Sequence, residues 1–193
     1  MTNSIRLRTA GGLAALATGL LLASAPAIAQ DASDTDSKTF DVIGSVPILC
    51  SGGTLTGDGV FDLGVLIDTS TGYLRTDLSA PDKVLTGAFC SARSTISISA
   101  TRIEAQNYAG AAPAGFSKEV DYTATASGWT DTPASFDTGA TTNPADTQVR
   151  DSAFTGDITV GISNFTTTGG ATLRPVADTS YLGQVVVTLS AAE

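Results

Sequence analysis

The sequence predicts an exported, all-β protein, and three observations support this. Hydrophobic and polar residues alternate in several short segments, whereas no window after residue 30 shows the 3.6-residue period of a helix. Gly, Pro, Asn and Asp separate these segments at short intervals, as turns between strands require. The chain has two cysteines, Cys50 and Cys90, which bracket strand-like segments and predict a disulfide.

The N-terminus predicts a secretory signal peptide over residues 1–29. Two arginines precede an apolar run at residues 11–23, and Ala-Ile-Ala at residues 27–29 is a small-residue cleavage site. The rival interpretation is an uncleaved membrane anchor, but the run is shorter than the roughly 20 apolar residues that a span needs and ends at Pro26. We therefore expect a mature chain without a membrane span, located in the periplasm, at the cell surface or in an extracellular filament.

Composition argues against several classes of function. The chain has 10 basic and 19 acidic residues, a net charge of −9, and loses two arginines with the signal. This acidity argues against a nucleic-acid partner, which requires a basic surface. The chain has no histidine, which removes Ser-His-Asp and Cys-His catalysis and the usual zinc and haem ligands. A carboxylate pair stays open as an alternative to a solvated acidic surface, but we expect no enzyme, cofactor or metal.

The mature chain begins with an acidic arm at residues 30–39, which has no apolar side chain cluster to bury and is expected to be flexible. The first expected strand covers residues 40–49, and Pro47 marks an edge or a bend in it. One face of that strand carries Phe40, Val42, Gly44, Val46 and Ile48.

Further strands are expected by the same alternation. Residues 82–89 lead into the second cysteine, and residues 130–150 have no pattern and predict a long surface excursion. The other expected strands are at residues 60–67, 73–78, 94–103, 119–129, 154–165, 173–176 and 181–190.

Seven to nine short strands without a helix favour one antiparallel, two-sheet β-sandwich over residues 40–193, with a closed barrel as the alternative. Trp129, the single tryptophan, has two interpretations. At the end of a strand it is typical of core or rim packing, and it is also a candidate ligand contact that would stack on a sugar.

The two cysteines are expected to have a structural role. Closing a loop of 40 residues stabilises the fold by about 4 kcal/mol in the chain-entropy model. The alternatives are a metal site and a reactive thiol, but a metal site would need further Cys or His ligands, and neither Cys50 nor Cys90 belongs to a C-x-x-C pair.

Several spaced features resemble a known family. An alternating strand ends in Cys50, a Phe-x-Leu-Gly segment follows at residues 61–64, and Cys90 precedes the alternating isoleucines of residues 94–103. A final Tyr-x-Gly-x-Val-Val-Val-Thr-Leu strand occupies residues 181–189. Together they resemble pilin subunits of the chaperone–usher type and the related spore coat protein U-like domains.

The resemblance implies an immunoglobulin-like sandwich that lacks one strand. A periplasmic chaperone would hold the gap, and the N-terminal extension of a neighbouring subunit would later fill it by β-augmentation. The resemblance thus implies a periplasmic chaperone and an usher as partners. Phe40, Val42, Val46 and Ile48 are the candidate donor side chains. Two features depart from the family: residues 30–39 are acidic where an apolar donor is expected, and the final strand ends in Ser-Ala-Ala-Glu without an aromatic residue.

Two functions follow as expectations. The first is a non-enzymatic structural subunit of a bacterial surface filament or coat, which acts in adhesion and assembles with copies of itself or related subunits by strand exchange. The second is a stand-alone secreted or periplasmic binding module for a ligand such as carbohydrate, which would use Trp129 and the loop at residues 130–150.

Overall fold

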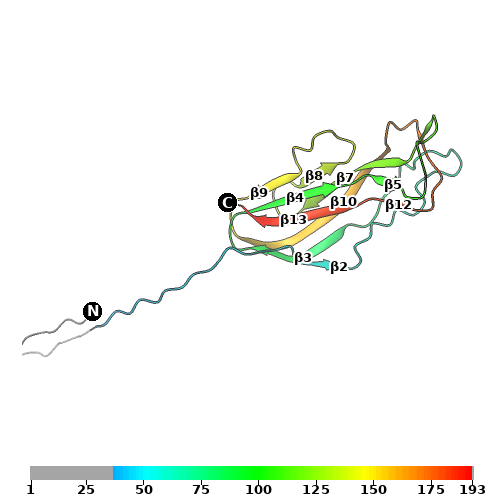
Figure 1. The fold of residues 1–193 in the computed structure, drawn as a ribbon. Coiled ribbons are helices and arrows are strands. Elements are labelled where there is room, and N and C mark those ends of the chain that lie inside the picture. Colours follow the sequence, from blue (N-terminus) through cyan, green and yellow to red (C-terminus); the bar gives the residue numbers. More distant parts are fainter. Residues whose placement is uncertain (1–36, 193) are drawn as a thin grey trace, which may run out of the picture. The chain divides into compact units, whose positions relative to one another are not determined.

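The structure is a computed structural model that describes residues 37–192, so the expected signal peptide and most of the acidic arm lie outside the described residues. The described chain is built of β-strands and loops and contains no α-helix (Figure 1). It divides after Gly44, and the compact unit, Ser45–Glu193, contains all of the described strands.

The described residues form strands whose bounds are β1 (Cys50–Ser51), β2 (Thr54–Thr56), β3 (Lys83–Cys90), β4 (Ser94–Ala100), β5 (Ile103–Ala105), β6 (Phe116–Ser117), β7 (Glu119–Ser127), β8 (Ala134–Asp137), β9 (Thr147–Arg150), β10 (Phe154–Thr167), β11 (Arg174–Pro175), β12 (Tyr181–Leu182) and β13 (Val185–Ala191).

Two antiparallel sheets make up most of the fold. Eight strands form one sheet in the order β1-β3-β10-β7-β5-β12, with β2 beside β3 and β8 beside β7. Three strands form the other sheet in the order β13-β4-β9, and β11 and β6 make a short parallel pair. The long strand β10 pairs with both β3 and β7, which places it at the centre of the larger sheet (Figure 1).

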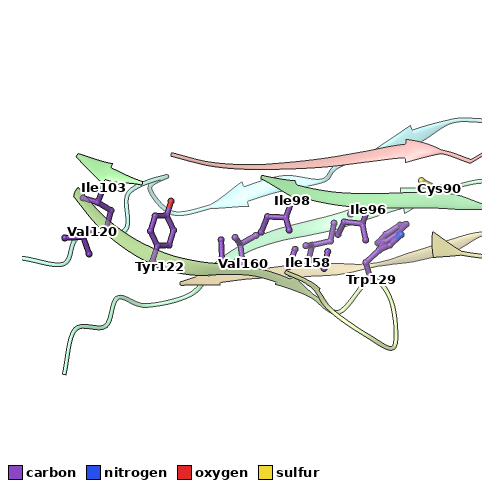
Figure 2. Packing of buried hydrophobic residues seen from close by; sticks show 13 residues of the cluster. Cys90, Ile96, Ile98, Ile103, Val120, Tyr122, Trp129, Ile158 and Val160 are labelled. Atoms are coloured by element: carbon purple, nitrogen blue, oxygen red, sulfur yellow. The ribbon is translucent and has the colours of Figure 1, made fainter. Parts of the chain in front are cut away.

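The hydrophobic core consists of side chains from both sheets. Ile96 and Ile98 of β4 share one face because side chains alternate along a strand, and they pack with residues of β7 and β10 (Figure 2). From the larger sheet come Val120, Tyr122, Ala124, Ala126, Ile158 and Val160, all buried. The alternation that predicted these strands therefore also selects the core face.

Three expected strands are absent. Residues 40–49 make no strand, and ladder pairing of this part of the chain begins only at Cys50. In residues 60–67 the side chains of Phe61 and Leu63 pack on the core, but the backbone forms only one isolated bridge, Ile67 with Leu74. The same bridge is all that forms of the short strand expected at residues 73–78.

Other expected strands are divided or were missed. The strand expected at residues 94–103 is split because the chain leaves the smaller sheet after β4 and enters the larger one at β5. The last strand makes the reverse change between β12 and β13 at Gly183, where a Cβ would lie only 3.1 Å from the Arg102 carbonyl oxygen. Residues 130–150, expected to be patternless, contain β8 and β9, since strands of four residues are too short to show a period.

Candidate functional site: a groove beside an unpaired strand edge

The expected disulfide is confirmed. Cys50 and Cys90 are bonded across the pair β1 and β3, where they are direct Cα partners 4.1 Å apart. Cys90 is buried in the core, and Cys50 packs against the same cluster. The bridge therefore joins the start of the compact unit to a strand of the larger sheet.

One edge of β13 has no strand partner among the described residues. β13 pairs with β4 alone. On the edge that faces β4, the Gln184 carbonyl oxygen accepts a hydrogen bond from the Thr101 N–H. Because backbone groups alternate along a strand, the even-numbered residues of β13 face β4. The N–H and C=O groups of Val185, Val187 and Leu189 therefore point to the open edge, while the side chains of the same three residues face the core.

A groove of about 1160 Å³ lies beside this region. One side is residues 59–67, called the groove wall below, and the other is residues 175–185, which lead into β13. Ile103, Tyr122 and Ile162 contribute side chains from the larger sheet to the lining. The groove is open to solvent, since lining residues such as Val60, Val65 and Leu182 are exposed.

The groove wall lies outside the sheets, and the hydrogen bonds of its backbone are local, such as the bond from the Gly64 N–H to the Asp62 carboxylate. Phe61 and Leu63 are half-buried and point to the core, whereas Val60 and Val65 are exposed. Its backbone makes no ladder before the isolated bridge at Ile67. The groove is thus lined on one side by backbone outside any sheet and on the other by a segment that reaches Val185, the first residue of the unpaired edge of β13.

Hydrogen bonds fix the opposite rim. The Asp178 carboxylate accepts bonds from the Ser180 N–H at 2.9 Å and from the Asn107 N–H at 2.7 Å. The Ser180 bond, followed by the Asn107 side chain, holds the pKa of Asp178 below its ordinary value. The Tyr181 hydroxyl donates to the Val176 carbonyl oxygen at 2.7 Å, so residues 176–181 form a closed loop at the rim.

Tyr122 lies on the floor of the groove. Its hydroxyl donates to the Gln184 carbonyl oxygen at 3.2 Å, at the point where the chain enters β13. Burial raises the pKa of Tyr122 to about 12, so the phenol is neutral at physiological pH. Its ring also stacks with Phe165, with centroids 6.1 Å apart.

The candidate donor residues are exposed. The exposed fractions are 83% for Phe40, 98% for Val42, 87% for Val46 and 60% for Ile48. The structure therefore does not bring these side chains into its own core. Just after them, the Leu49 N–H donates to the Ser91 hydroxyl at 2.9 Å, and the Ser91 N–H donates to the Leu49 carbonyl oxygen.

Trp129 lies in the core. It is completely buried, its ring meets Phe154 edge to face at 5.1 Å, and its indole N–H donates to the Ser94 hydroxyl. This is the core-packing alternative, and it leaves no ring face open to a sugar. The Arg150 guanidinium lies over the ring of Phe154, 3.5 Å from its centre.

Sequence reasoning found the disulfide but did not find the groove. Its walls come from residues 59–67 and 175–185, which are far apart in the chain and were expected to be ordinary strands and turns. The one available signal was the final strand, whose apolar face of Tyr181, Val185, Val187 and Leu189 is only partly buried in the structure.

No protein-family model matches the chain, and no curated protein or solved structure is significantly similar to it. Within residues 37–192, no group of three or more His, Cys, Asp or Glu side chains is placed to hold a metal ion. The same residues include no helix that is long and apolar enough to span a membrane.

Proposed function

We propose that the chain is a non-enzymatic structural subunit of a bacterial surface filament or coat, acts in adhesion, and assembles by strand exchange between copies. The fold would be an immunoglobulin-like sandwich that lacks one strand. One observation carries the proposal: a groove that reaches Val185, the first residue on the unpaired edge of β13, occurs in a chain that also exposes an alternating apolar segment at residues 40–48.

The chemistry of the segment suits the groove. An inserted strand would receive N–H and C=O groups from Val185, Val187 and Leu189 on one side and from the groove wall on the other. Its alternate residues Phe40, Val42, Val46 and Ile48 would cover the apolar lining. Burial of a valine or phenylalanine side chain contributes about 1.5–3 kcal/mol, so four such side chains provide a substantial driving force.

Pro47 favours a donor antiparallel to β13. In an antiparallel pair, the inward residues Val46 and Ile48 would bond to β13, and Pro47 would face the groove wall, where one missing N–H is the whole loss. In a parallel pair, the outward residues would bond to β13 instead, and Pro47 would interrupt that ladder. The sequence of the segment therefore suits the antiparallel direction.

The antiparallel direction favours a second copy as donor. Leu49 is tied to the turn after β3, and the end of β13 is tied to the same turn by the bond from the Ala192 N–H to the Arg93 carbonyl oxygen. If residues 40–48 filled the groove of their own chain, they would run toward Leu49 and therefore in the same direction as β13. This is the parallel arrangement that Pro47 disfavours. Copies of this chain or related subunits are therefore the proposed partners, and a periplasmic chaperone would cover the same edge before assembly.

Size-exclusion chromatography of periplasmic protein tests the proposal. We expect residues 30–193 to form multimers and residues 44–193 to remain monomeric. Val42→Asp with Val46→Asp should abolish the multimers, because both side chains would enter the groove. Ile43→Asp is the matched control, since its side chain points the other way and should leave assembly unchanged. A cooperatively melting monomer from residues 30–193 would contradict strand exchange and favour a stand-alone binding module.

A further inference from the structure

The groove wall lies inside the loop that the disulfide closes. Between Cys50 and Cys90 the chain passes through β1, β2, the groove wall and the bridge at Ile67 before it returns along β3. The N-terminal segment therefore joins the compact unit at the same residue at which the covalent link to β3 begins.

Few noncovalent contacts hold the start of this loop. β1 pairs with β3 over two residues and β2 over three. Beyond β2, an ion pair joins Asp58 to Lys83 at 2.6 Å, and the Asp58 carboxylate is largely exposed, so it contributes little. The groove wall follows at once, anchored by the side chains of Phe61 and Leu63 and not by a ladder.

We propose that the Cys50–Cys90 disulfide carries tension from the N-terminal segment directly into β3 and keeps it away from the groove wall. This rests on the proposed function, in which each copy is pulled through its own donor segment while its groove holds the donor of another copy. β3 is well placed to receive the load because it pairs with β10, which also pairs with β7 at the centre of the larger sheet.

Without the disulfide, tension would reach the groove by a short route. It would first remove β1 and β2 from β3 and then pull on the groove wall itself. Pulling on one donor segment would thus open the groove that holds the next donor. With the disulfide intact, tension from the copy's own N-terminal segment bypasses residues 51–89, so pulling on that segment does not strip the groove wall away from the donor it holds.

Single-molecule pulling on the full mature chain tests the path of force. One handle is attached at the N-terminus, and the other at a tag inserted in the exposed loop at residues 141–142. We expect Cys50→Ser/Cys90→Ser to show an early, low-force event that releases the roughly 30 residues before β3, on the order of 100 Å of chain. The oxidised protein should lack this event. The same early event in both proteins, or in neither, would overturn the proposal.

Two further measurements separate the possible failures. If the variant does not fold, a thiol reductant added to the oxidised wild-type protein in the pulling cell should produce the same early event. In multimers, loss of the disulfide should lower the force at which copies separate, and an unchanged force would overturn the link to the groove. If wild-type multimers never form, the proposed function fails, while pulling on the single chain still decides the path of force.

Discussion

The indole N–H of Trp129 donates a hydrogen bond to the Ser94 hydroxyl over 3.1 Å, and both side chains are completely buried. Ser94 begins β4 in the smaller sheet, whereas Trp129 follows β7 of the larger sheet. The bond therefore joins the two sheets through the core. It also satisfies the one polar atom of the largest fully buried side chain.

Ser94→Ala should destabilise the fold by about 1–3 kcal/mol, because the buried indole N–H would lose its partner. Urea unfolding followed by the fluorescence of the single tryptophan measures this. Ser99→Ala is the control, since Ser99 lies on the exposed side of the same strand and its loss should change stability by about 0.5 kcal/mol or less. Equal unfolding midpoints for the two variants would contradict the structural role of the bond.

Val187→Pro should leave a folded monomer but abolish strand exchange. The N–H of Val187 points to the open edge of β13, so proline removes no hydrogen bond of the monomer, but it removes an N–H with which an added strand would pair. Thr188→Pro is the matched comparison, because its N–H faces Ser97 in the ladder with β4 and its loss should cost about 3 kcal/mol or more. Thermal melting and size-exclusion chromatography measure both effects. Wild-type multimers from the Val187→Pro protein would argue against pairing at this edge.

The rim of the groove should loosen in acid. Hydrogen bonds from Ser180 and Asn107 lower the pKa of Asp178 from the ordinary value of 3.8. The unfolded chain thus binds a proton more readily than the folded one, so the stabilising contribution of Asp178 is complete above pH 3.8 and disappears as the pH falls through the lowered pKa. The amide NMR shifts of Ser180 and Asn107 should follow this titration. Asp178→Asn should remove the transition, and its persistence in that variant would assign it elsewhere.

Alkaline pH should destabilise the floor of the groove. The pKa of Tyr122 is raised to about 12 by burial, against an ordinary value of 10.0, so the folded state resists deprotonation. Stability is therefore unaffected below pH 10 and falls as the pH rises toward 12. Tyr122→Phe should lose about 1 kcal/mol near pH 8, from the bond to Gln184, and should then decline less with pH. Urea midpoints at about pH 8 and pH 11 compare the two proteins, and identical declines would contradict this role.

Alternation in the sequence predicted which residues face the core, because burial on one side of a strand leaves a period of two. Ile96 and Ile98, with Val120 and Tyr122, are buried as that pattern required. The pattern did not show that the chain changes sheets after Ala100, since side chains alternate in the same way on either side of a crossover. Sheet membership depends on contacts between distant segments, which a local period does not contain.

The same reason explains the unformed strand at residues 40–49. Alternation indicates that a segment is suited to pairing but does not say whether its partner belongs to the same chain. Phe40 and Val42 have the pattern of a strand, yet both are exposed. The groove was missed because neither of its walls can be recognised from the sequence alone. Phe61 and Val185 line the same groove only because the fold brings them together.

The two walls of the groove also set an order in time. Residues 59–67 are made early and residues 175–185 late, and about 100 residues of other strands separate them. During synthesis, the first wall therefore waits for residues 175–185 before any groove exists, because long-range pairing needs both partners. Residues 40–48 are complete long before that moment. Under the proposed strand exchange, a growing chain would be able to donate a strand well before it could accept one.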